Sequence, residues 1–171
     1  VQRLVGNPWV PGGADTCLGV ADGEGRNGVW LAGQGLSVAS FDLSPTAVER
    51  AQVLAAKSGV GINAYVSDWE GWDWSQSFDL VVAVLVQFMG PEARVRQFET
   101  LREAVRPGGR LVLHGYTPEQ VEFGTGGPPY PENMYTPELL NDAFGDWRVL
   151  RLAAYEREVQ EERGYSGPGS Y

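Results

Sequence analysis

Residues Thr16–Ser44, TCLGVADGEGRNGVWLAGQGLSVASFDLS, contain the pattern that decides the fold of this 171-residue chain. A short apolar run, Cys17–Val20, predicts a buried strand, and Gly23, Gly25 and Gly28 follow it. Glycine tolerates positive φ and carries no Cβ, so the backbone can turn sharply there and a ligand can approach it closely. The stretch therefore predicts a strand that ends in a glycine turn.

The residues after the glycine turn predict a helix and a second strand. The helix is expected to open near Arg26, and its first N–H groups would point at the turn, where they favour an anionic group. Leu36–Phe41 has strand character, and Asp42 stands where that strand should end, 19 residues after Gly23. A carboxylate at this spacing can accept hydrogen bonds from ribose hydroxyls. The pattern favours a ligand that contains a nucleoside.

The glycine pattern has alternative explanations. Glycines also mark ordinary strand-to-helix turns, so a G-x-G-x-x-G spacing alone is a weak signal. The two flanking strands, the helix and the terminal acid favour a nucleoside site over a purely structural turn. The pattern does not distinguish NAD from S-adenosylmethionine, a distinction that depends on the rest of the chain.

Composition and charge restrict the classes of function. A hydrophobic content of 43% suits one domain with a sizeable core. The formal net charge of -9 and the isoelectric point near 4.6 oppose sequence-independent binding to nucleic acid or anionic lipid, because both require a positive surface. Five arginines interleave with glutamates in a pattern typical of a solvated helix face rather than of a phosphate-binding patch: Arg94, Arg96, Arg102, Arg106 and Arg110.

Cys17 is the only cysteine, so no intrachain disulfide can form, and no cluster of cysteine and histidine could hold structural zinc. We expect no metal, a cytoplasmic location, and a core function for Cys17 within its apolar strand. The longest strongly apolar run, Leu80–Val86, is too short to span a bilayer. The chain starts at Val1 and stops at SGPGSY, from which we expect that parts of both ends of a single longer domain are missing.

The segments on either side of the opening unit also have recognisable patterns. Residues 1–15 predict an irregular lead-in with a helical turn at 1–5. Ser44-Pro45 predicts a capped helix start, and the helix should run to about Ser58, with a core face formed by Val48, Ala51, Leu54 and Ala55. Residues 62–66 predict a third strand.

Asp68 follows this third strand and allows two interpretations. Its carboxylate could accept a hydrogen bond from an adenine amino group, or it could bond its own backbone as an ordinary turn residue. Trp69, Trp72 and Trp74 lie in the same loop. They either shield the edge of an adenine ring or pack on their own domain.

The uninterrupted apolar run Phe78–Val86 predicts a central parallel strand that is covered on both faces, in the middle of the sheet. Gln87 follows at the carboxyl end, where ligands bind in open α/β sheets, so it is a candidate for substrate or cofactor contact. Residues 91–105 predict a helix with an apolar stripe of Val95, Phe98, Leu101 and Val105, residues 107–109 a tight turn, and residues 111–115 the next strand. Alternating strands and helices at this spacing predict a doubly wound, mostly parallel α/β sheet with helices on both faces.

The ordered set ADGEGRNG, FDLS, SDW, FDLVVAVLV and RPGGRLVLHGY resembles the class I S-adenosylmethionine-dependent methyltransferases, and more narrowly the small bacterial methyltransferases of the tellurite-resistance TehB type. The resemblance covers about residues 14–162. It implies a Rossmann-like fold, S-adenosylmethionine as cofactor and S-adenosylhomocysteine as product.

The resemblance also implies functions for individual residues. Gly23 and Gly25 would face the methionine part of the cofactor, with Arg26 or Asn27 near its carboxylate. Asp42 would hold the ribose, Leu43 would pack on adenine, and Asp68 with Trp69 would meet the adenine edge. The full expected cofactor set is Ala21, Gly23, Gly25, Arg26, Asn27, Asp42, Leu43, Asp68, Trp69, Val84 and Gln87.

The sequence departs from the family pattern at the first glycine of the turn. Ala21 replaces that glycine, and Gly19 stands where the family usually carries an acidic residue. The departure raises the alternative of a methyltransferase-like domain that binds a nucleoside for regulation without turnover.

Residues after the fifth strand are expected to bind the methyl acceptor. The substrate candidates are Gln87, Tyr116, Glu119 and Gly126, together with Thr117 and Gln120, and the loop 124–129 is a candidate lid. Thr136-Pro137 predicts a further helix, and residues 147–158 a long sixth strand. Residues 165–171 would lead to an antiparallel seventh strand that relatives place between the fifth and sixth and that is largely missing here.

The leading hypothesis is transfer of a methyl group to a small-molecule acceptor. His114, the only histidine, lies in a strand pattern, where a hydrogen-bonded structural residue is expected rather than a catalytic base. In-line transfer from a sulfonium needs alignment more than acid–base catalysis, so a thiol or a metalloid oxyanion could react without a base. A NAD enzyme lacks support because no second catalytic domain follows, and a nucleic-acid methyltransferase is opposed by the charge.

Overall fold

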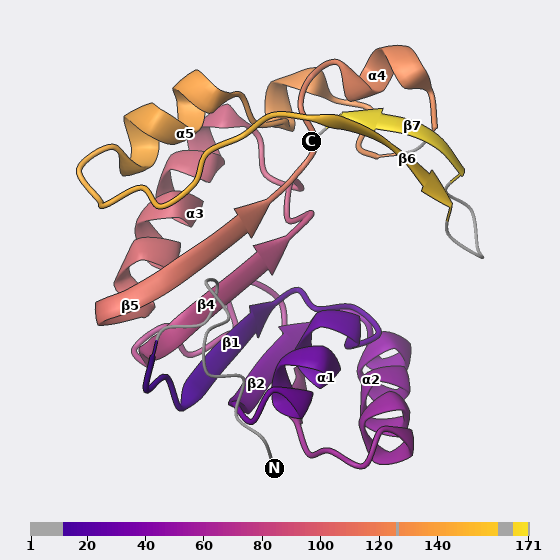
Figure 1. The fold of residues 1–171 in the computed structure, drawn as a ribbon, viewed down its shortest axis with the longest axis vertical. Coiled ribbons are helices and arrows are strands. Elements are labelled where there is room, and N and C mark those ends of the chain that lie inside the picture. The colour runs from indigo at the N-terminus through magenta and orange to yellow at the C-terminus, as the bar shows by residue number, and fades with distance from the viewer. Residues whose placement is uncertain (1–11, 126, 161–165, 171) are drawn as a thin grey trace. The chain divides into compact units, whose positions relative to one another are not determined.

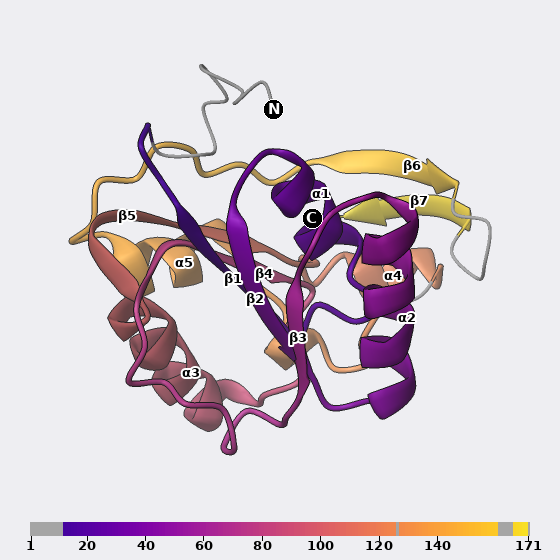
Figure 2. The ribbon, with the colours of Figure 1, turned by 90° about the horizontal axis from the view of Figure 1, so that it is seen from below.

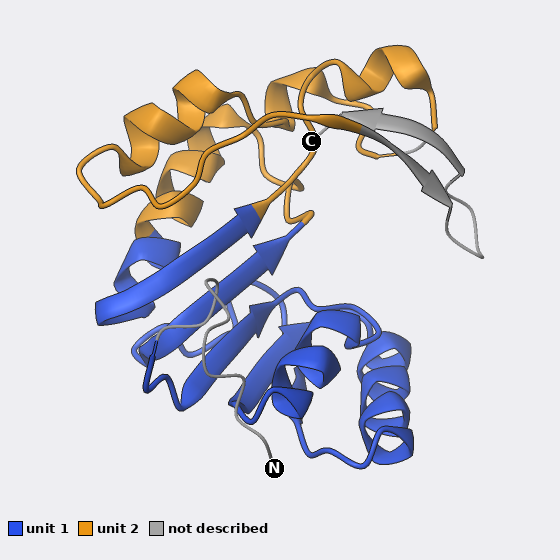
Figure 3. Cartoon of the chain, in the orientation of Figure 1, with its two compact units in different colours: residues 1–84, 100–113 blue, residues 85–99, 114–171 orange. Residues whose placement is uncertain are grey.

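A computed structural model of the chain describes residues 12–125, 127–160 and 166–170, with residues 157–160 and 166–170 described as backbone only. The chain divides into two compact units, which Figure 3 distinguishes by colour. Unit 1 comprises residues 1–84 and 100–113, and unit 2 comprises residues 85–99 and 114–171. The expected helical turn at residues 1–5 lies outside the described residues.

Unit 1 contains a five-stranded parallel sheet with the order β3-β2-β1-β4-β5; Figure 1 labels four of these strands, and Figure 2 labels β3 as well. The strands are β1 (Thr16–Val20), β2 (Ser37–Asp42), β3 (Asn63–Val66), β4 (Phe78–Val84) and β5 (Val105–His114). This arrangement confirms the predicted α/β class. The middle position belongs to β1, so the prediction that 78–86 forms the middle strand was wrong by one place.

The core of unit 1 forms where buried residues of β1, β2 and β4 stand side by side. Cys17 pairs with Val38 on one side and with Leu80 on the other. These three side chains are buried in one cluster with Leu31, Leu36 and Val82. Burial, together with the nearby Asp22 carboxylate, raises the pKa of the Cys17 thiol to about 12. The thiol therefore stays protonated, as expected for a core residue.

Helices α1 (Arg26–Gly33) and α2 (Pro45–Lys57) lie on one side of the sheet (Figure 2). The Ser44 hydroxyl accepts a hydrogen bond from Ala47 N at 3.3 Å and so caps α2 as the sequence predicted. Val48, Ala51 and Ala55 of the predicted core face are buried, whereas Leu54 is only half-buried.

Helix α3 (Pro91–Glu103) ends two residues before the prediction, because Val105 already belongs to β5. The predicted apolar stripe is correct at Phe98 and Leu101, which are buried, but wrong at Val95, which is 58% exposed. The face of the helix that is buried carries Arg94 and Gln97 in place of Val95. Two polar residues therefore occupy buried positions that the apolar pattern did not predict.

The predicted turn at residues 107–109 is part of β5 rather than a separate connection. Gly108 has a φ of 82°, a conformation that glycine adopts without steric cost. A Cβ on Gly109 would lie 2.8 Å from the carbonyl oxygen of Asp79, so only glycine fits against the neighbouring strand. The two glycines thus shape the start of the strand instead of terminating the helix.

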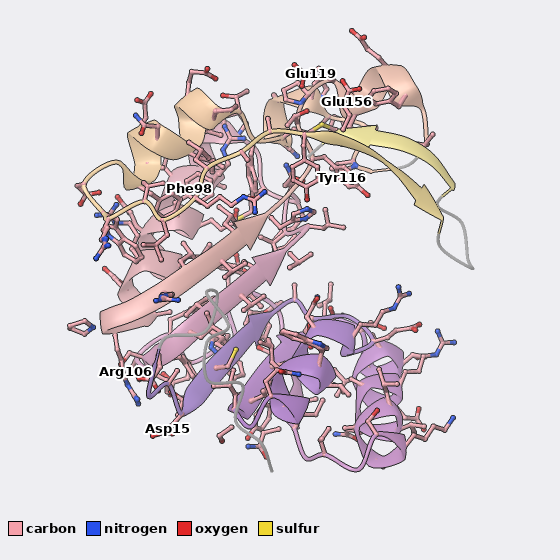
Figure 4. The ribbon with its side chains drawn as sticks, in the orientation of Figure 1. Asp15, Phe98, Arg106, Tyr116, Glu119 and Glu156 are labelled. Carbon is pink, nitrogen blue, oxygen red and sulfur yellow. The ribbon has the colours of Figure 1, made fainter. Side chains whose placement is uncertain are left out.

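Asp79 joins the amino-terminal ends of β1, β4 and β5. Its Oδ2 atom accepts hydrogen bonds from the Thr16 N–H at 2.9 Å and the Thr16 hydroxyl at 2.8 Å, and its Oδ1 atom lies 3.3 Å from a guanidinium nitrogen of Arg106. Figure 4 shows Arg106 and Asp15 at this end of the sheet. These contacts lie at the opposite end of the strands from Asp42.

Unit 2 contains short helices and a separate pair of strands. Its elements besides the first part of α3 are α4 (Gln120–Phe123), a 3-10 helix η1 (Pro131–Asn133), α5 (Pro137–Phe144), β6 (Glu156–Gln160) and β7 (Ser166–Ser170). Thr136 Oγ1 accepts from Leu139 N at 3.2 Å, which confirms the predicted start of α5.

The predicted strand 147–158 is wrong over most of its length, because regular structure begins only at Glu156. Residues 148–155 are exposed, so the apolar side chains that suggested a strand have no buried surface to pack on. β6 pairs antiparallel with β7, from Glu156 opposite Ser170 to Gln160 opposite Ser166. The antiparallel seventh strand was expected between the fifth and sixth strands, but β6 and β7 form a two-stranded sheet of their own.

Among the described helices, none combines the length and the apolar character needed to cross a membrane.

Candidate cofactor site

The connection from β1 to α1 is a tight turn with three residues in the left-handed region. Ala21 has a φ of 47°, Gly23 of 58° and Gly25 of 80°. The N–H of Asp22 donates to the carbonyl oxygen of Phe41 at 3.1 Å, and the Asp22 carbonyl accepts from Gly25 N at 3.0 Å. The turn is therefore tied to the end of β2 and closed on itself.

The Asp42 carboxylate lies directly beside this turn. Its Oδ2 accepts a hydrogen bond from Gly23 N at 3.0 Å, and its Oδ1 accepts from Ser44 N at 2.9 Å. Each carboxylate oxygen can accept a further bond, so ribose hydroxyls remain possible donors. The structure thus brings together the glycine turn and the terminal acid, two features that the sequence placed 19 residues apart.

Gly23 and Gly25 are glycines for different reasons. A Cβ built on Gly23 would meet no atom within 4 Å, so the turn leaves open space at this point. A Cβ on Gly25 would lie 2.5 Å from the Cβ of Ala51 in α2. Gly23 therefore suits the approach of a ligand, whereas Gly25 allows two helices to come close.

Arg26 and Asn27 form the first turn of α1, and both are exposed. The Asn27 side chain is hydrogen-bonded to Asp22. Leu43, directly after β2, is 72% exposed, which is unusual for a large apolar side chain. An apolar group exposed beside the Asp42 carboxylate suits the adenosine part of S-adenosylmethionine, so the residues present fit the cofactor that the resemblance implies.

Asp22 is part of this site and was missed by the sequence analysis. Its Oδ2 accepts a hydrogen bond from Gly28 N at 3.0 Å. Burial raises the pKa of the Asp22 carboxyl to about 6; the Gly28 N–H and the Asn27 side chain oppose the rise, and the Asp42 charge adds to it. The available signal was a glycine in place of the usual acid at position 19, with an acid three residues later.

Asp68 behaves as the turn residue of the two interpretations. Its Oδ1 accepts from Gly71 N at 2.7 Å, which closes a turn after β3. Asp68 is exposed, and its other carboxylate oxygen remains a candidate acceptor for an adenine amino group. Contact between Asp68 and the cofactor stays a prediction.

The three tryptophans of the following loop pack on unit 1. Trp72 stacks on Phe41 with ring centroids 4.7 Å apart, and Trp74 meets the same ring edge-on at 5.7 Å. Trp74 Nε1 donates to the Trp69 carbonyl at 2.7 Å, and the two indoles lie 4.4 Å apart. The loop is thus held by its own aromatic side chains, as the second interpretation proposed.

In unit 2, Gln87 directs both ends of its amide to one residue. Its Nε2 donates to the Tyr116 carbonyl at 2.7 Å, and its Oε1 accepts from Tyr116 N at 2.7 Å. The side chain is buried, and a Cβ on Gly115 would lie 2.7 Å from it. Gln87 therefore fixes the segment after β5. Contact between Gln87 and the cofactor or substrate stays a prediction.

Val84 and Leu85 mark the end of β4. Val84 is the last residue of the strand and is half-buried. Leu85 has a φ of 58°, is 44% exposed, and donates its N–H to the His114 carbonyl at 2.8 Å. Positive φ in a branched residue is uncommon and occurs where the surroundings hold the backbone in place. The strained residues Ala21 and Leu85 each follow a strand of the parallel sheet.

The substrate candidates differ in their exposure. Tyr116, Thr117 and Gln120 are buried, and Gln120 Nε2 donates to Thr125 Oγ1 at 3.0 Å. Glu119 is exposed, and a hydrogen bond from the Thr117 side chain lowers the pKa of its carboxyl. Gly126 lies outside the described residues.

Glu119 and Thr117 line an open groove of about 550 Å³ within unit 2. The other lining residues are Pro118, Thr136, Pro137, Glu138, Ala154, Tyr155 and Glu156. Figure 4 shows Glu119 and Glu156 close to one another in this region. Its polar lining is acidic, since three glutamates and no arginine or lysine contribute to it.

The interpretation of the five arginines as a solvated face is wrong for Arg94. This residue is 8% exposed and donates to the carbonyl oxygens of Glu132 at 2.7 Å and Met134 at 3.4 Å. Burial lowers the pKa of its guanidinium, and the nearby Tyr135 opposes that effect. Arg96 and Arg106 are exposed as expected.

His114 ends β5, and its Nε2 lies 3.2 Å from the Tyr155 hydroxyl. The hydrogen-bonded strand histidine that the sequence favoured over a catalytic base is what the structure contains.

The chain belongs to a methyltransferase family: the family model described as "Methyltransferase domain" matches residues 17–109. This stretch contains the glycine turn, Asp42, Asp68 and Gln87. S-adenosylmethionine is the cofactor that membership of this family implies.

Three similar proteins illustrate the relationship. The carboxy-S-adenosyl-L-methionine synthase of Vibrio vulnificus is 29% identical over 133 residues, covering 76% of this chain and 49% of that protein. The structure of TehB from Haemophilus influenzae has a TM-score of 0.69 at 18% identity, over 91% of this chain and 54% of that chain. A structure from work on the conversion of a disulfide bond into a thioacetal group during echinomycin biosynthesis has a TM-score of 0.70 at 22% identity. The match covers 91% of this chain and 71% of that chain.

At these identities the two structures indicate a shared fold. The chain spans 38% to 49% of the length of the curated relatives that it matches.

Proposed function

We propose that this protein transfers a methyl group from S-adenosylmethionine to a small-molecule acceptor. The observation that carries the proposal is the Asp42 carboxylate on the N–H of Gly23, beside open space above the turn, in a chain of the methyltransferase family. In this proposal Asp42 accepts from the ribose hydroxyls and the exposed Leu43 packs on the adenine. Ala21, Gly23, Gly25, Arg26 and Asn27 surround the methionine part.

When bound, the cofactor supplies a methyl group on a positively charged sulfur, which is an excellent leaving group. The protein then has to align the acceptor with the carbon–sulfur bond and exclude water. The acceptor forms the new bond to carbon, and the sulfur keeps the electron pair of the bond that breaks. A soft thiolate or a metalloid oxyanion needs no base for this step, which agrees with the structural function of His114.

For the acceptor we propose a thiol, a metalloid oxyanion or another small nucleophile. Similarity to TehB and to a structure from work on a disulfide substrate supports soft acceptors. Among the substrate candidates, Tyr116 and Glu119 are retained, whereas Gln87 is proposed to position Tyr116 through its two hydrogen bonds. We further propose that the protein is of the TehB-like subtype, that its two units belong to a single domain, and that it is cytoplasmic.

Calorimetric titration with S-adenosylmethionine, S-adenosylhomocysteine and NAD tests the cofactor. We expect binding of the first two and none of NAD, and tight binding of NAD alone would overturn the proposal. Incubation with labelled S-adenosylmethionine and a panel of thiols and metalloid oxyanions then tests the reaction.

A second candidate function is binding of the nucleoside for regulation without turnover. The observation that favours it is Ala21, whose φ of 47° places a side chain where the family carries glycine. Methylated product in the acceptor panel would exclude it. Binding of S-adenosylmethionine without product from any acceptor or from cell extract would favour it.

A further inference from the structure

The side chain of Asp22 lies beside Gly19, near the end of β1. Gly19 carries no side chain, and a Cβ built on it would lie 3.3 Å from both Cβ and Cγ of Asp22 and 3.2 Å from Cβ of Ser40. Asp22 therefore folds back over the strand. A side chain at position 19 would crowd Asp22 in this conformation.

The same carboxylate explains a second glycine. A Cβ on Gly28 would lie 2.5 Å from Asp22 Oδ2, the atom that accepts the Gly28 N–H at 3.0 Å. The next atom that this Cβ would meet outside Asp22 is Val38 Cγ1, at an ordinary 3.5 Å. A side chain at position 28 would therefore displace the Asp22 carboxylate, which is the one group closer than 3.5 Å among the nearest atoms.

Asp22 supplies the cap that α1 otherwise lacks. Gly25 is the N-cap residue of the helix and has no side chain to accept from the first N–H groups. Asp22 performs this function from three residues upstream, while its own N–H and C=O bond Phe41 and Gly25. One residue therefore joins β2, the turn and α1.

The polar and titratable groups around this carboxylate come from each neighbouring element. Cys17 of β1 and Asp42 at the end of β2 interact with it electrostatically, and Asn27 of α1 bonds it. Asp42 in turn accepts from Gly23, the residue that follows Asp22. The position of Asp22 thus affects the N–H that the proposed ribose-binding acid already holds.

We propose that Asp22 is the positioning residue of the cofactor turn: its hydrogen bond to Gly28 holds the turn in the conformation that binds S-adenosylmethionine. Gly19 and Gly28 leave room for the Asp22 side chain in this hydrogen bond. The inference rests on the proposed function, because the turn is assigned to S-adenosylmethionine there.

The first experiment measures binding of S-adenosylhomocysteine by calorimetry at 20 °C, where circular dichroism must show each variant folded. Asp22→Ala removes the carboxylate and should raise Kd on the order of tenfold, equivalent to the loss of one charge-assisted hydrogen bond. Asp22→Asn keeps an oxygen for the Gly28 N–H and should retain most of the affinity. Glu49→Gln, an exposed acid on α2, is the control.

The second experiment displaces the carboxylate without changing Asp22. In Gly28→Ala the new methyl group would push the Asp22 side chain away, because this side chain is the flexible partner of the contact. Gly28→Ala should therefore weaken binding as much as Asp22→Ala does. The double variant should bind no more weakly than either single variant.

Wild-type affinity in Asp22→Ala, or effects of the two substitutions that add up in the double variant, would overturn the inference. Failure of the wild-type chain to bind S-adenosylhomocysteine would instead overturn the proposed function. NMR of the protein without ligand distinguishes the two failures. The amide chemical shift of Gly28 should change with the ionisation of Asp22 between pH 5 and 7, and this change should be absent in Asp22→Asn.

Discussion

Two regions of this molecule follow strands of the same sheet and use polar groups in opposite ways. In the glycine turn of unit 1, the carboxylates of Asp42 and Asp22 accept hydrogen bonds from the backbone N–H groups of Gly23 and Gly28. In unit 2, buried side chains of Gln87, Arg94 and Gln97 turn towards backbone carbonyl groups. A polar residue near the end of a strand therefore indicates a ligand site only after its hydrogen bonds have been traced.

The buried polar cluster of unit 2 replaces regular backbone pairing. Residues 85–90 and 115–119 contain no strand or helix, so their carbonyl groups need other donors. Gln97 Nε2 donates to Val86 O at 3.1 Å, and Arg94 donates to the carbonyl oxygens of Glu132 and Met134. Such a cluster stabilises irregular backbone as long as each partner is present.

The largest expected effect is on the stability of this cluster. Gln87→Leu removes two buried hydrogen bonds, so the Tyr116 N–H loses its Gln87 acceptor while the Tyr116 carbonyl keeps the N–H of Tyr135. The free energy of unfolding should therefore fall by about 3 kcal/mol. Chemical denaturation measures the change. Gln52→Leu, an exposed glutamine on α2, should change it by less than about 0.5 kcal/mol. Equal losses of unfolding free energy in Gln87→Leu and Gln52→Leu would mean that the buried hydrogen bonds of unit 2 do not stabilise the protein.

Affinity rather than stability should respond in the glycine turn. Asp42→Ala removes the carboxylate that holds Gly23 N, and it should weaken S-adenosylhomocysteine binding by roughly 1.5 to 3 kcal/mol through loss of charge-assisted hydrogen bonds. Calorimetry measures this change, with Glu49→Ala as the control. Unchanged affinity would mean that the ribose has been placed wrongly.

The ionisation of Asp22 should make stability depend on pH. Burial raises its pKa from 3.8 to about 6, so between these values the folded chain holds a proton that the unfolded chain has released. Stability of the wild-type protein should therefore fall as the pH rises from 4 to 6, on the order of 2 kcal/mol, and stay level above that range. Denaturation of wild type and Asp22→Asn at each pH measures the difference, and parallel profiles would contradict it.

The smallest expected effect concerns Ala21. A non-glycine residue at a φ of 47° carries a steric cost, so Ala21→Gly should stabilise the protein by about 0.5 to 1 kcal/mol after the extra entropy of glycine in the unfolded chain is subtracted. Thermal unfolding measures the shift. Loss of stability in this variant would mean that the alanine methyl makes contacts that offset the strain.

The sequence predicted the fold correctly where burial of apolar residues or helix capping determines the local structure. Strands β1 and β4 contain the apolar runs Cys17–Val20 and Leu80–Val84, whose residues are mostly buried. Ser44-Pro45 predicts the start of α2 through its capping chemistry. The juxtaposition of Gly23 and Asp42 followed from parallel strands that end at the same edge. Local patterns were sufficient in these cases because they and the tertiary structure favour the same result.

Prediction failed where side chains compensate for irregular backbone. Arg94 lies on the buried face of α3 because carbonyl groups distant in sequence need its guanidinium, and no periodicity contains that information. Val105 and Gly108 read as a helix end and a turn, yet pairing within the sheet extends β5 through them. Asp22 was missed because its hydrogen bond with Gly28 N depends on the conformation of its side chain, which no spacing in the sequence indicates.

The stacking of Trp72 on Phe41 has a consequence for measurement. Trp69, Trp72 and Trp74 account for three of the six tryptophans of the chain. Trp72 and Trp74 contact Phe41, the residue directly before Asp42, and Trp69 packs on Trp74. Indole emission responds to the polarity and packing around the ring, so this group acts as a built-in fluorescent reporter. A change in emission on titration would follow events at the end of β2 without any attached dye, and replacing Trp72 by phenylalanine would assign the signal to that indole.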